Sequence, residues 1–101
     1  MSRSIQTLFD LKGRTALVTG GSRGLGLQIA ESLGEAGAKI MLSSRKAADL
    51  EESAAHLQAK GIDTRWIAAD ASQPSEIERI ANETLERLGQ VDILVNNAGA
   101  T

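Results

Sequence analysis

The stretch Thr15–Gly26, TALVTGGSRGLG, constrains the fold more than any other part of this 101-residue sequence. Its apolar run, Ala16–Thr19, is typical of a buried strand, and a glycine-rich turn and a helical pattern follow. Gly20, Gly24 and Gly26 let the backbone turn sharply and approach a ligand without a Cβ in the way. Free N–H groups at the start of the helix suit a pyrophosphate. Taken alone, the turn is equally consistent with an ordinary strand-to-helix connection.

The rest of the sequence repeats this alternation. Apolar periodicity and glycine stops predict helices over about residues 24–36 and 47–60, and strands over residues 39–44, 64–69 and 91–95. A third helix starts near Pro74, with Ser72 or Gln73 as its expected cap, and ends before Gly89. Two positions carry specific expectations. Gly34 lies inside the first helix, which indicates either close packing or a weak point, and Trp66 is expected to pack at a sheet edge.

This order predicts an α/β fold, a Rossmann-like, doubly wound parallel sheet with strand order 3-2-1-4 and right-handed crossovers. The first two helices then cover one face and the third helix is alone on the other. Ligands bind such sheets at the carboxyl ends of the strands, beside the topological switch. Four segments meet there, namely Gly20–Gly26, Ser44–Arg45, Asp70 and Asn96–Gly99.

Composition excludes several classes of function. The formal net charge is -2, from 11 basic and 13 acidic side chains that are dispersed, so we expect no nucleic-acid partner. The sequence has no cysteine and one histidine, His56, which is expected to be a solvated surface residue, so no metal site is predicted. It also lacks a signal-peptide pattern and any run of about 20 apolar residues. We therefore expect a soluble cytoplasmic protein without a membrane partner.

Three motifs together carry a family resemblance. TGGSRGLG follows the first strand, Asp70 and Ala71 follow the third, and NNAG at residues 96–99 follows the fourth. Over about residues 10–99 the sequence resembles the N-terminal half of the short-chain dehydrogenase/reductase family, and is similar to its 3-oxoacyl-carrier-protein reductase and gluconate 5-dehydrogenase types. The glycine spacing differs from the G-x-G-x-x-G of other dinucleotide folds.

The resemblance implies a dinucleotide cofactor and a set of residues that bind it. The predicted cofactor-binding residues are Gly20, Gly21, Ser22, Arg23, Gly24, Leu25, Gly26, Ser44, Arg45, Asp70, Ala71, Asn97, Ala98 and Gly99. In this interpretation, Asp70 accepts a hydrogen bond from the adenine amino group, the N–H of Ala71 faces a ring nitrogen, and residues 97–99 line the ribose. Asn96 has a structural role. The alternatives are a helix-capping role for Asp70 and plain turn chemistry for the asparagines.

The charges after the second strand predict the choice of cofactor. NAD-binding folds usually place an acidic residue there to hold the ribose 2′-OH, whereas NADP needs cations for its 2′-phosphate. Here Ser43, Ser44 and Arg45 occupy that position, and Arg23 adds a second guanidinium from the glycine turn. We therefore predict NADP(H). The alternative is that both arginines are solvated surface charges.

Catalysis is the least constrained part of the interpretation. The family transfers hydride between the nicotinamide and a carbonyl or secondary alcohol, using a tyrosine and a lysine. This sequence contains no tyrosine, so no catalytic residue is assigned. We interpret residues 1–12 as an arm and residues 13–101 as a partial dinucleotide-binding domain of a longer, homo-oligomeric enzyme. The isolated chain, with strand 91–95 as an open edge, is expected to be unstable or to self-associate.

Two other functional classes remain open at this point. One is a non-catalytic nucleotide-binding or interaction protein that retains only this half of the fold. The other, a methyltransferase-like nucleotide binder, is disfavoured by the NNAG motif and by the missing acidic residue after the second strand. A Tyr-x-x-x-Lys segment beyond Thr101 would separate the enzyme from the non-catalytic protein.

Overall fold

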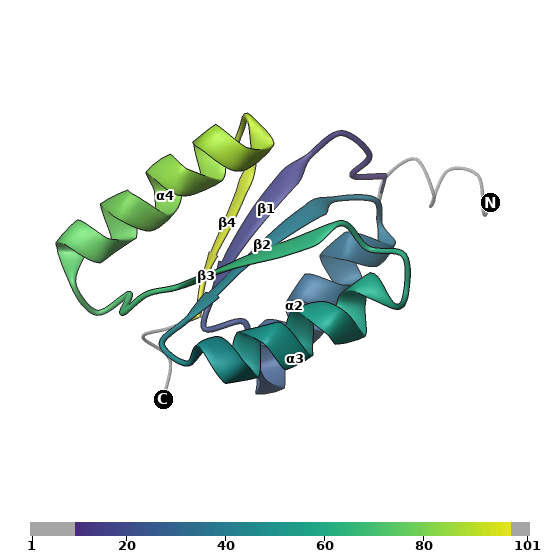
Figure 1. The fold of residues 1–101 in the computed structure, drawn as a ribbon. Coiled ribbons are helices and arrows are strands. Elements are labelled where there is room, and N and C mark those ends of the chain that lie inside the picture. The colour runs from purple at the N-terminus through teal and green to yellow at the C-terminus, as the bar shows by residue number, and fades with distance from the viewer. Residues whose placement is uncertain (1–9, 98–101) are drawn as a thin grey trace.

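The computed structural model describes residues 10–97, in which a four-stranded sheet lies between two layers of helices (Figure 1). In chain order, the elements are β1 (Thr15–Thr19), α2 (Gly24–Glu35), β2 (Lys39–Ser44), α3 (Ala47–Gln58), β3 (Thr64–Ala68), α4 (Pro74–Leu88) and β4 (Ile93–Asn96). The alternation of strands and helices predicted from the sequence is confirmed.

All paired strands of the sheet are parallel, and their order is β3-β2-β1-β4. Leu17 of β1 lies in register with Met41 of β2 on one side and with Leu94 of β4 on the other. Because β4 lies on the opposite side of β1 from β2, the connections diverge between β1 and β4, which is where such sheets bind ligands. The predicted strand order is confirmed.

Side chains that alternate along the strands form a separate core on each face of the sheet. On one face, α2 and α3 cover a cluster that includes Leu42 and Leu57, both fully buried. On the other face, α4 is the one helix among residues 10–97, and it covers a smaller cluster that includes Met41 and Ile80 (Figure 1). Burial on both faces explains why β1 and β2 read as continuous apolar runs.

The predicted element boundaries agree with the structure to within two residues. The last strand begins at Ile93 rather than at residue 91, and α3 ends at Gln58 rather than at residue 60. Asp92 lies just before the strand, where its N–H donates to the carbonyl of Thr15 at 2.9 Å and its carboxylate accepts the N–H of Thr15 at 2.8 Å. Gly61, with φ of 82°, leads the chain away from α3.

The structure decides both specific expectations about packing. A Cβ on Gly34 would collide with Cγ2 of Ile62 and lie 2.9 Å from its Cδ1, so this helix glycine is a close-packing position. Trp66, on the edge strand β3, is partly buried against the core beneath α2 and α3. The interpretation of Trp66 as an edge-packing residue is confirmed. Leu11 also packs against this core, whereas Phe9 lies outside the described residues.

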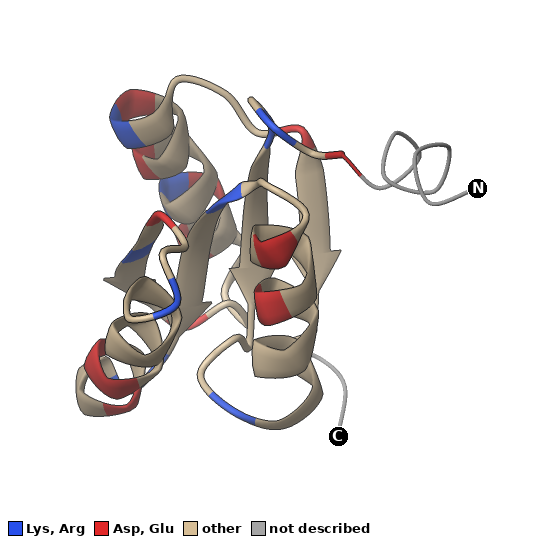
Figure 2. Ribbon diagram, turned by 90° about the vertical axis from the view of Figure 1, so that its right-hand side faces the viewer, with Lys and Arg blue, Asp and Glu red and all other residues tan. Residues whose placement is uncertain are grey.

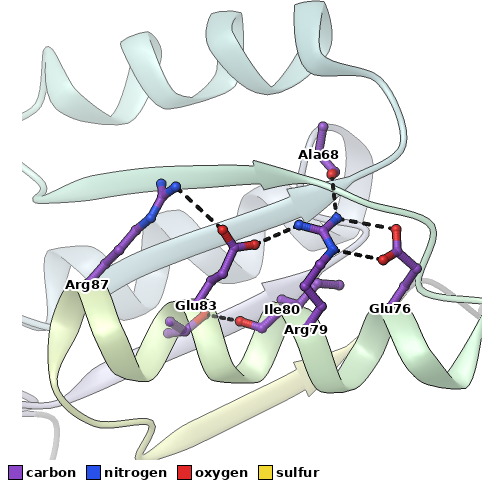
Figure 3. Close-up of polar contacts among 7 residues, drawn as sticks. Ala68, Glu76, Arg79, Ile80, Glu83 and Arg87 are labelled. Carbon is purple, nitrogen blue, oxygen red and sulfur yellow. Dashed lines mark hydrogen bonds and ion pairs between the residues drawn. The ribbon is translucent and has the colours of Figure 1, made fainter.

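A hydrogen bond from Arg79, whose guanidinium also forms ion pairs within α4, links this helix to the edge of the sheet (Figure 3). Arg79 contacts Glu76 at 2.8 Å and Glu83 at 2.6 Å, and its Nη2 donates to the carbonyl of Ala68, the last residue of β3, at 3.1 Å. Lys, Arg, Asp and Glu are coloured in Figure 2: α4 carries both acidic and basic residues, whereas α2 and α3 carry acidic ones alone. Within residues 10–97, none of the helices is long and apolar enough to cross a membrane.

Candidate functional site

The glycine-rich turn after β1 has a backbone that other residues would strain. Gly20 and Gly24 have φ of 67° and 59°, in the left-handed region that favours glycine. A Cβ on Gly26 would collide with the carbonyl oxygen of Gly20, so α2 can approach the turn this closely only with glycine at that position. The sequence-based expectation of a tight turn with close backbone approach is confirmed.

Three neighbouring segments hold this turn in place. The N–H of Gly20 donates to the carbonyl of Ser43 in β2 at 2.7 Å. Ser53 of α3 donates its hydroxyl to the carbonyl of Ser22 at 2.6 Å. The N–H of Asn97 donates to the carbonyl of Thr19 at 3.2 Å. The sequence did not predict the contribution of Ser53, because this residue lies within a helix and belongs to no motif.

The first turn of α2 opens onto the glycine-rich turn. Arg23 occupies the N-cap position with extended backbone, and its side chain makes no capping hydrogen bond. Leu25, a predicted cofactor-binding residue, also falls at an apolar position of the helical periodicity over residues 24–36, but it is 62% exposed rather than buried. The reason is that Leu25 lies in the first turn, beyond the core cluster that Ala30 joins further along the helix.

Asp70 follows β3 in a tight local turn. Its Oδ1 accepts hydrogen bonds from the N–H of Ser72 at 3.0 Å and from the Ser72 hydroxyl at 2.6 Å. These bonds, the hydroxyl first, lower the pKa of the Asp70 carboxyl below its ordinary value. Oδ2 has no hydrogen bond within residues 10–97. Gln73, one of the two expected caps, is the N-cap residue of α4, but its side chain makes no capping hydrogen bond. The Ser72 hydroxyl donates to Asp70 instead.

A hollow of about 300 Å³ lies between the ends of β2 and β3. It is lined by Gly20, Ser44, Arg45, Ala69, Asp70, Ala71 and Ser72. Five of these residues are predicted cofactor-binding residues from three separate segments of the chain. The connection after β3 is fixed in two ways, since Ala69 donates its N–H to the carbonyl of Ser44 at 2.8 Å and Arg79 holds Ala68.

A second hollow, of about 380 Å³, lies on the other side of Ser44 and Arg45. It is lined by Gly20, Ser22, Arg23, Ser44, Arg45, Lys46, Asp49 and Asn97. The hydroxyls of Ser22 and Ser44 are 3.1 Å apart and link the glycine-rich turn to the end of β2. Ser43 does not reach this hollow, because it is fully buried and alternates with Ser44 onto the α4 face.

Asp49 is a residue of this hollow that the sequence analysis missed. Its Oδ2 lies 2.9 Å from Nη2 of Arg23 in an ion pair between the first turn of α3 and the glycine-rich turn. The bond to Arg23 lowers the pKa of Asp49, and the same bond raises the pKa of Arg23. Arg45, by contrast, forms no ion pair within residues 10–97. The sequence held one sign of this ion pair, because Asp49 is an acidic residue only four positions after Arg45.

The two asparagines at the end of β4 have different contacts. Asn96 accepts a hydrogen bond from the Thr19 hydroxyl at 3.0 Å, which is the structural role expected of it. Asn97 donates from Nδ2 to the carbonyl of Gly20 at 3.4 Å and lines the second hollow. The predicted residues Ala98 and Gly99 lie outside the described residues.

The remaining titratable candidates lie at the surface. His56 of α3 is 51% exposed, and its Nε2 lies 3.0 Å from a carboxylate oxygen of Glu31 in α2. Lys60 contacts the other oxygen of Glu31 at 3.3 Å. These contacts, His56 first, lower the pKa of Glu31. In the part of the chain that the structure describes, no group of three or more histidine, aspartate or glutamate side chains could hold a metal ion.

Comparison with known proteins identifies the same arrangement elsewhere. Residues 14–101 match the family model described as short chain dehydrogenase. The chain is 46% identical over 93 residues to the rhamnolipids biosynthesis 3-oxoacyl-[acyl-carrier-protein] reductase of Pseudomonas aeruginosa, covering 92% of this chain and 36% of the relative. It is 40% identical over 94 residues to the gluconate 5-dehydrogenase of Gluconobacter oxydans, covering 91% and 36%. The chain thus spans little more than a third of either relative.

Solved structures of short chain dehydrogenases and reductases have the same fold as this chain. L-sorbose reductase from Gluconobacter frateurii, complexed with NADPH and L-sorbose, superposes with a TM-score of 0.86 at 36% identity, covering 91% of this chain and 35% of the other. The NADP complex of RhlG from Pseudomonas aeruginosa superposes with a TM-score of 0.84 at 45% identity, covering 92% and 37%. At these identities, the likeness extends beyond the fold to the family.

Proposed function

Because the chain belongs to the short chain dehydrogenase family, we propose that it is the cofactor-binding part of an NADP(H)-dependent oxidoreductase that acts on a carbonyl or secondary alcohol. The observation that carries the proposal is the hollow between the glycine-rich turn and the end of β2. Three cations, Arg23, Arg45 and Lys46, line it, against one carboxylate. Such an excess of positive charge suits a 2′-phosphate.

The glycine-rich turn supplies the cradle for the rest of the nucleotide. A side chain at Gly26 would fill the space in which α2 approaches Gly20, so the first-turn amides of α2 lie against the turn. We assign the pyrophosphate to these amides and to the positive end of the helix dipole. Asp70 and Ala71, in the neighbouring hollow, are assigned to the adenine, and Asn97, Ala98 and Gly99 to the adenosine ribose.

The chemistry divides between the cofactor and the protein. When bound, the nicotinamide cofactor supplies or accepts the hydride, and the residues of this chain bind and orient it. Reduction of a carbonyl also needs a proton donor close to the substrate oxygen. The sequence contains no tyrosine, and we assign no residue of it to proton transfer. The proposal therefore gives this chain the cofactor half-site and places the acid and base in another part of the enzyme.

The similar structures of L-sorbose reductase and RhlG are complexes with NADPH and NADP, which supports the same cofactor here. The catalytic substrates of the curated relatives differ, since one reduces a 3-oxoacyl group and the other acts on gluconate. The substrate class proposed for this protein is accordingly no narrower than a carbonyl or secondary alcohol.

A binding experiment tests the cofactor. In the protein as its gene encodes it, NADPH is expected to bind more tightly than NADH, and Arg45→Ala is expected to weaken NADPH binding about tenfold or more while changing NADH binding little. The matched control is Arg65→Ala, which removes an exposed arginine of β3 that pairs with Asp63. Equal affinities for the two cofactors, or an unchanged NADPH affinity in Arg45→Ala, would contradict the proposal. Binding without NADPH oxidation by any carbonyl substrate would favour a non-catalytic nucleotide-binding protein.

A further inference from the structure

We infer that Asp49 sets the cofactor selectivity of this site by competing with the 2′-phosphate for Arg23. The inference rests on the proposed function and extends it to a residue outside the family motifs. Two groups compete for one guanidinium, because Asp49 already lies 2.9 Å from Nη2 of Arg23 and lines the same hollow as Ser44 and Arg45.

The position of Asp49 makes it the fixed member of the ion pair. Asp49 is the third residue of α3, in the first turn, where the helix dipole favours a negative charge. Its side chain is 31% exposed, whereas that of Arg23 is 74% exposed and projects from the glycine-rich turn. A ligand that needs Arg23 therefore draws the guanidinium away from a carboxylate that remains in place.

The ion pair reduces what Arg23 can offer to a phosphate. A guanidinium binds a phosphate through two parallel N–H donors on one of its edges. Because Asp49 already accepts a hydrogen bond from Nη2 of Arg23, one such edge is partly occupied. The carboxylate also offsets one of the three positive charges that line the hollow and repels a phosphate dianion. Both effects disfavour a 2′-phosphate, whereas a ribose with a free 2′-OH carries no charge for Asp49 to oppose.

The opposite role for Asp49 would be to orient Arg23 toward the phosphate. The two roles differ in the sign of one measurement. If Asp49 competes, its neutralisation strengthens binding of nucleotides that carry a 2′-phosphate. If Asp49 orients, its neutralisation weakens that binding, because the exposed arginine loses the contact that holds it.

The test measures the dissociation constants of adenosine 2′,5′-bisphosphate and of 5′-AMP by calorimetry, in the protein as its gene encodes it. Asp49→Asn is expected to tighten binding of the bisphosphate about two- to fivefold, the range that corresponds to an exposed ion pair, and to leave 5′-AMP unchanged. Glu52→Gln is the matched control, since Glu52 is one turn further along α3 and forms no ion pair within residues 10–97. Its effect is expected to be smaller than that of Asp49→Asn.

Each outcome has a distinct meaning. Weaker or unchanged bisphosphate binding in Asp49→Asn, or equal tightening in Glu52→Gln, overturns the inference while the proposed cofactor stands. A wild-type protein that binds the bisphosphate no better than 5′-AMP overturns the proposed NADP(H) function and the inference with it. Asp49→Ser, which also suits the start of a helix, repeats the measurement in case Asp49→Asn folds poorly. In an Arg23→Ala background, the effect of Asp49→Asn is expected to shrink, because the competing pair is already broken.

Discussion

The two faces of the sheet differ in how completely helices cover them. Beneath α2 and α3, side chains such as Leu57 are fully buried, and even the helix glycine Gly34 is in close contact with Ile62. On the other face, α4 buries Ile80 completely, but Leu85 of α4 and Leu94 of β4 remain 48% and 60% exposed. The α2/α3 face is packed as a core, whereas the α4 face is packed only along one side of its helix.

This difference bears on the candidate site. The glycine-rich turn is held by β2, by Ser53 of α3 and by Asn97, and both hollows are lined by β2 or the segments that flank it. The glycine-rich turn is therefore fixed mainly from the α2/α3 face, whereas the hollow beside Asp70 also depends on α4, whose Arg79 holds Ala68. Three of the four exposed large apolar side chains within residues 10–97 belong to α4 or β4, namely Ile77, Leu85 and Leu94, and the fourth is Leu25 of α2.

The largest difference between the faces is expected from one substitution made on each. Leu57→Ala, on α3, is expected to lower the free energy of unfolding by about 2–5 kcal/mol, because it opens a cavity in a closed core. Leu85→Ala, on α4, is expected to cost about 1 kcal/mol or less, because half of that side chain is already in water. Urea unfolding of the protein as its gene encodes it measures both. Equal losses would mean that Leu85 is covered by a contact outside the described residues.

The close packing of α2 predicts a smaller but still measurable effect. Gly34→Ala gains helix propensity, about 1 kcal/mol, but its methyl group would collide with Ile62, which is buried and branched at Cβ. We expect a net destabilisation of about 1–2 kcal/mol in urea unfolding. In the background of Ile62→Ala, which removes the collision, the same substitution is expected to be neutral or stabilising. A stabilised Gly34→Ala variant would show that the α2/α3 face is less tightly packed than the structure indicates.

The smallest expected effect concerns the attachment of β4. The N–H of Thr15 donates to Asp92 at 2.8 Å, and this bond, ahead of those from Gln90 and Arg14, lowers the pKa of Asp92 below its ordinary 3.8. A lowered carboxyl pKa stabilises the folded state fully above 3.8, and this stabilisation is lost as the pH falls through the folded-state value. Asp92→Asn is expected to reduce the acid-induced fall in the urea midpoint. The control is Asp63→Asn, which removes an exposed carboxylate that pairs with Arg65. An equal reduction in this variant would contradict the stabilising role of Asp92.

Much of the fold follows from local patterns that the tertiary structure did not alter. Apolar runs, helical periodicity and glycine stops are properties of short segments, so they located every element to within two residues. The alternation of strands and helices then indicated a doubly wound sheet of order 3-2-1-4, in which Gly20, Ser44, Arg45 and Asp70 meet at one edge. For the same reason, the hollows contain the residues that the motifs had indicated.

The sequence by itself determined the order of the elements, the topology of the sheet and the edge at which its special residues meet, because each follows from local periodicity and from the doubly wound sheet that such an alternation forms. Only the tertiary structure decided which side chains pair. Arg23 and Asp49 are 26 positions apart, and Ser53 reaches Ser22 across 31 positions. Such contacts depend on how α3 lies against the glycine-rich turn, which no periodicity encodes. The exposure of Leu25 has the same origin, since a helical stripe is buried only where a neighbour covers it.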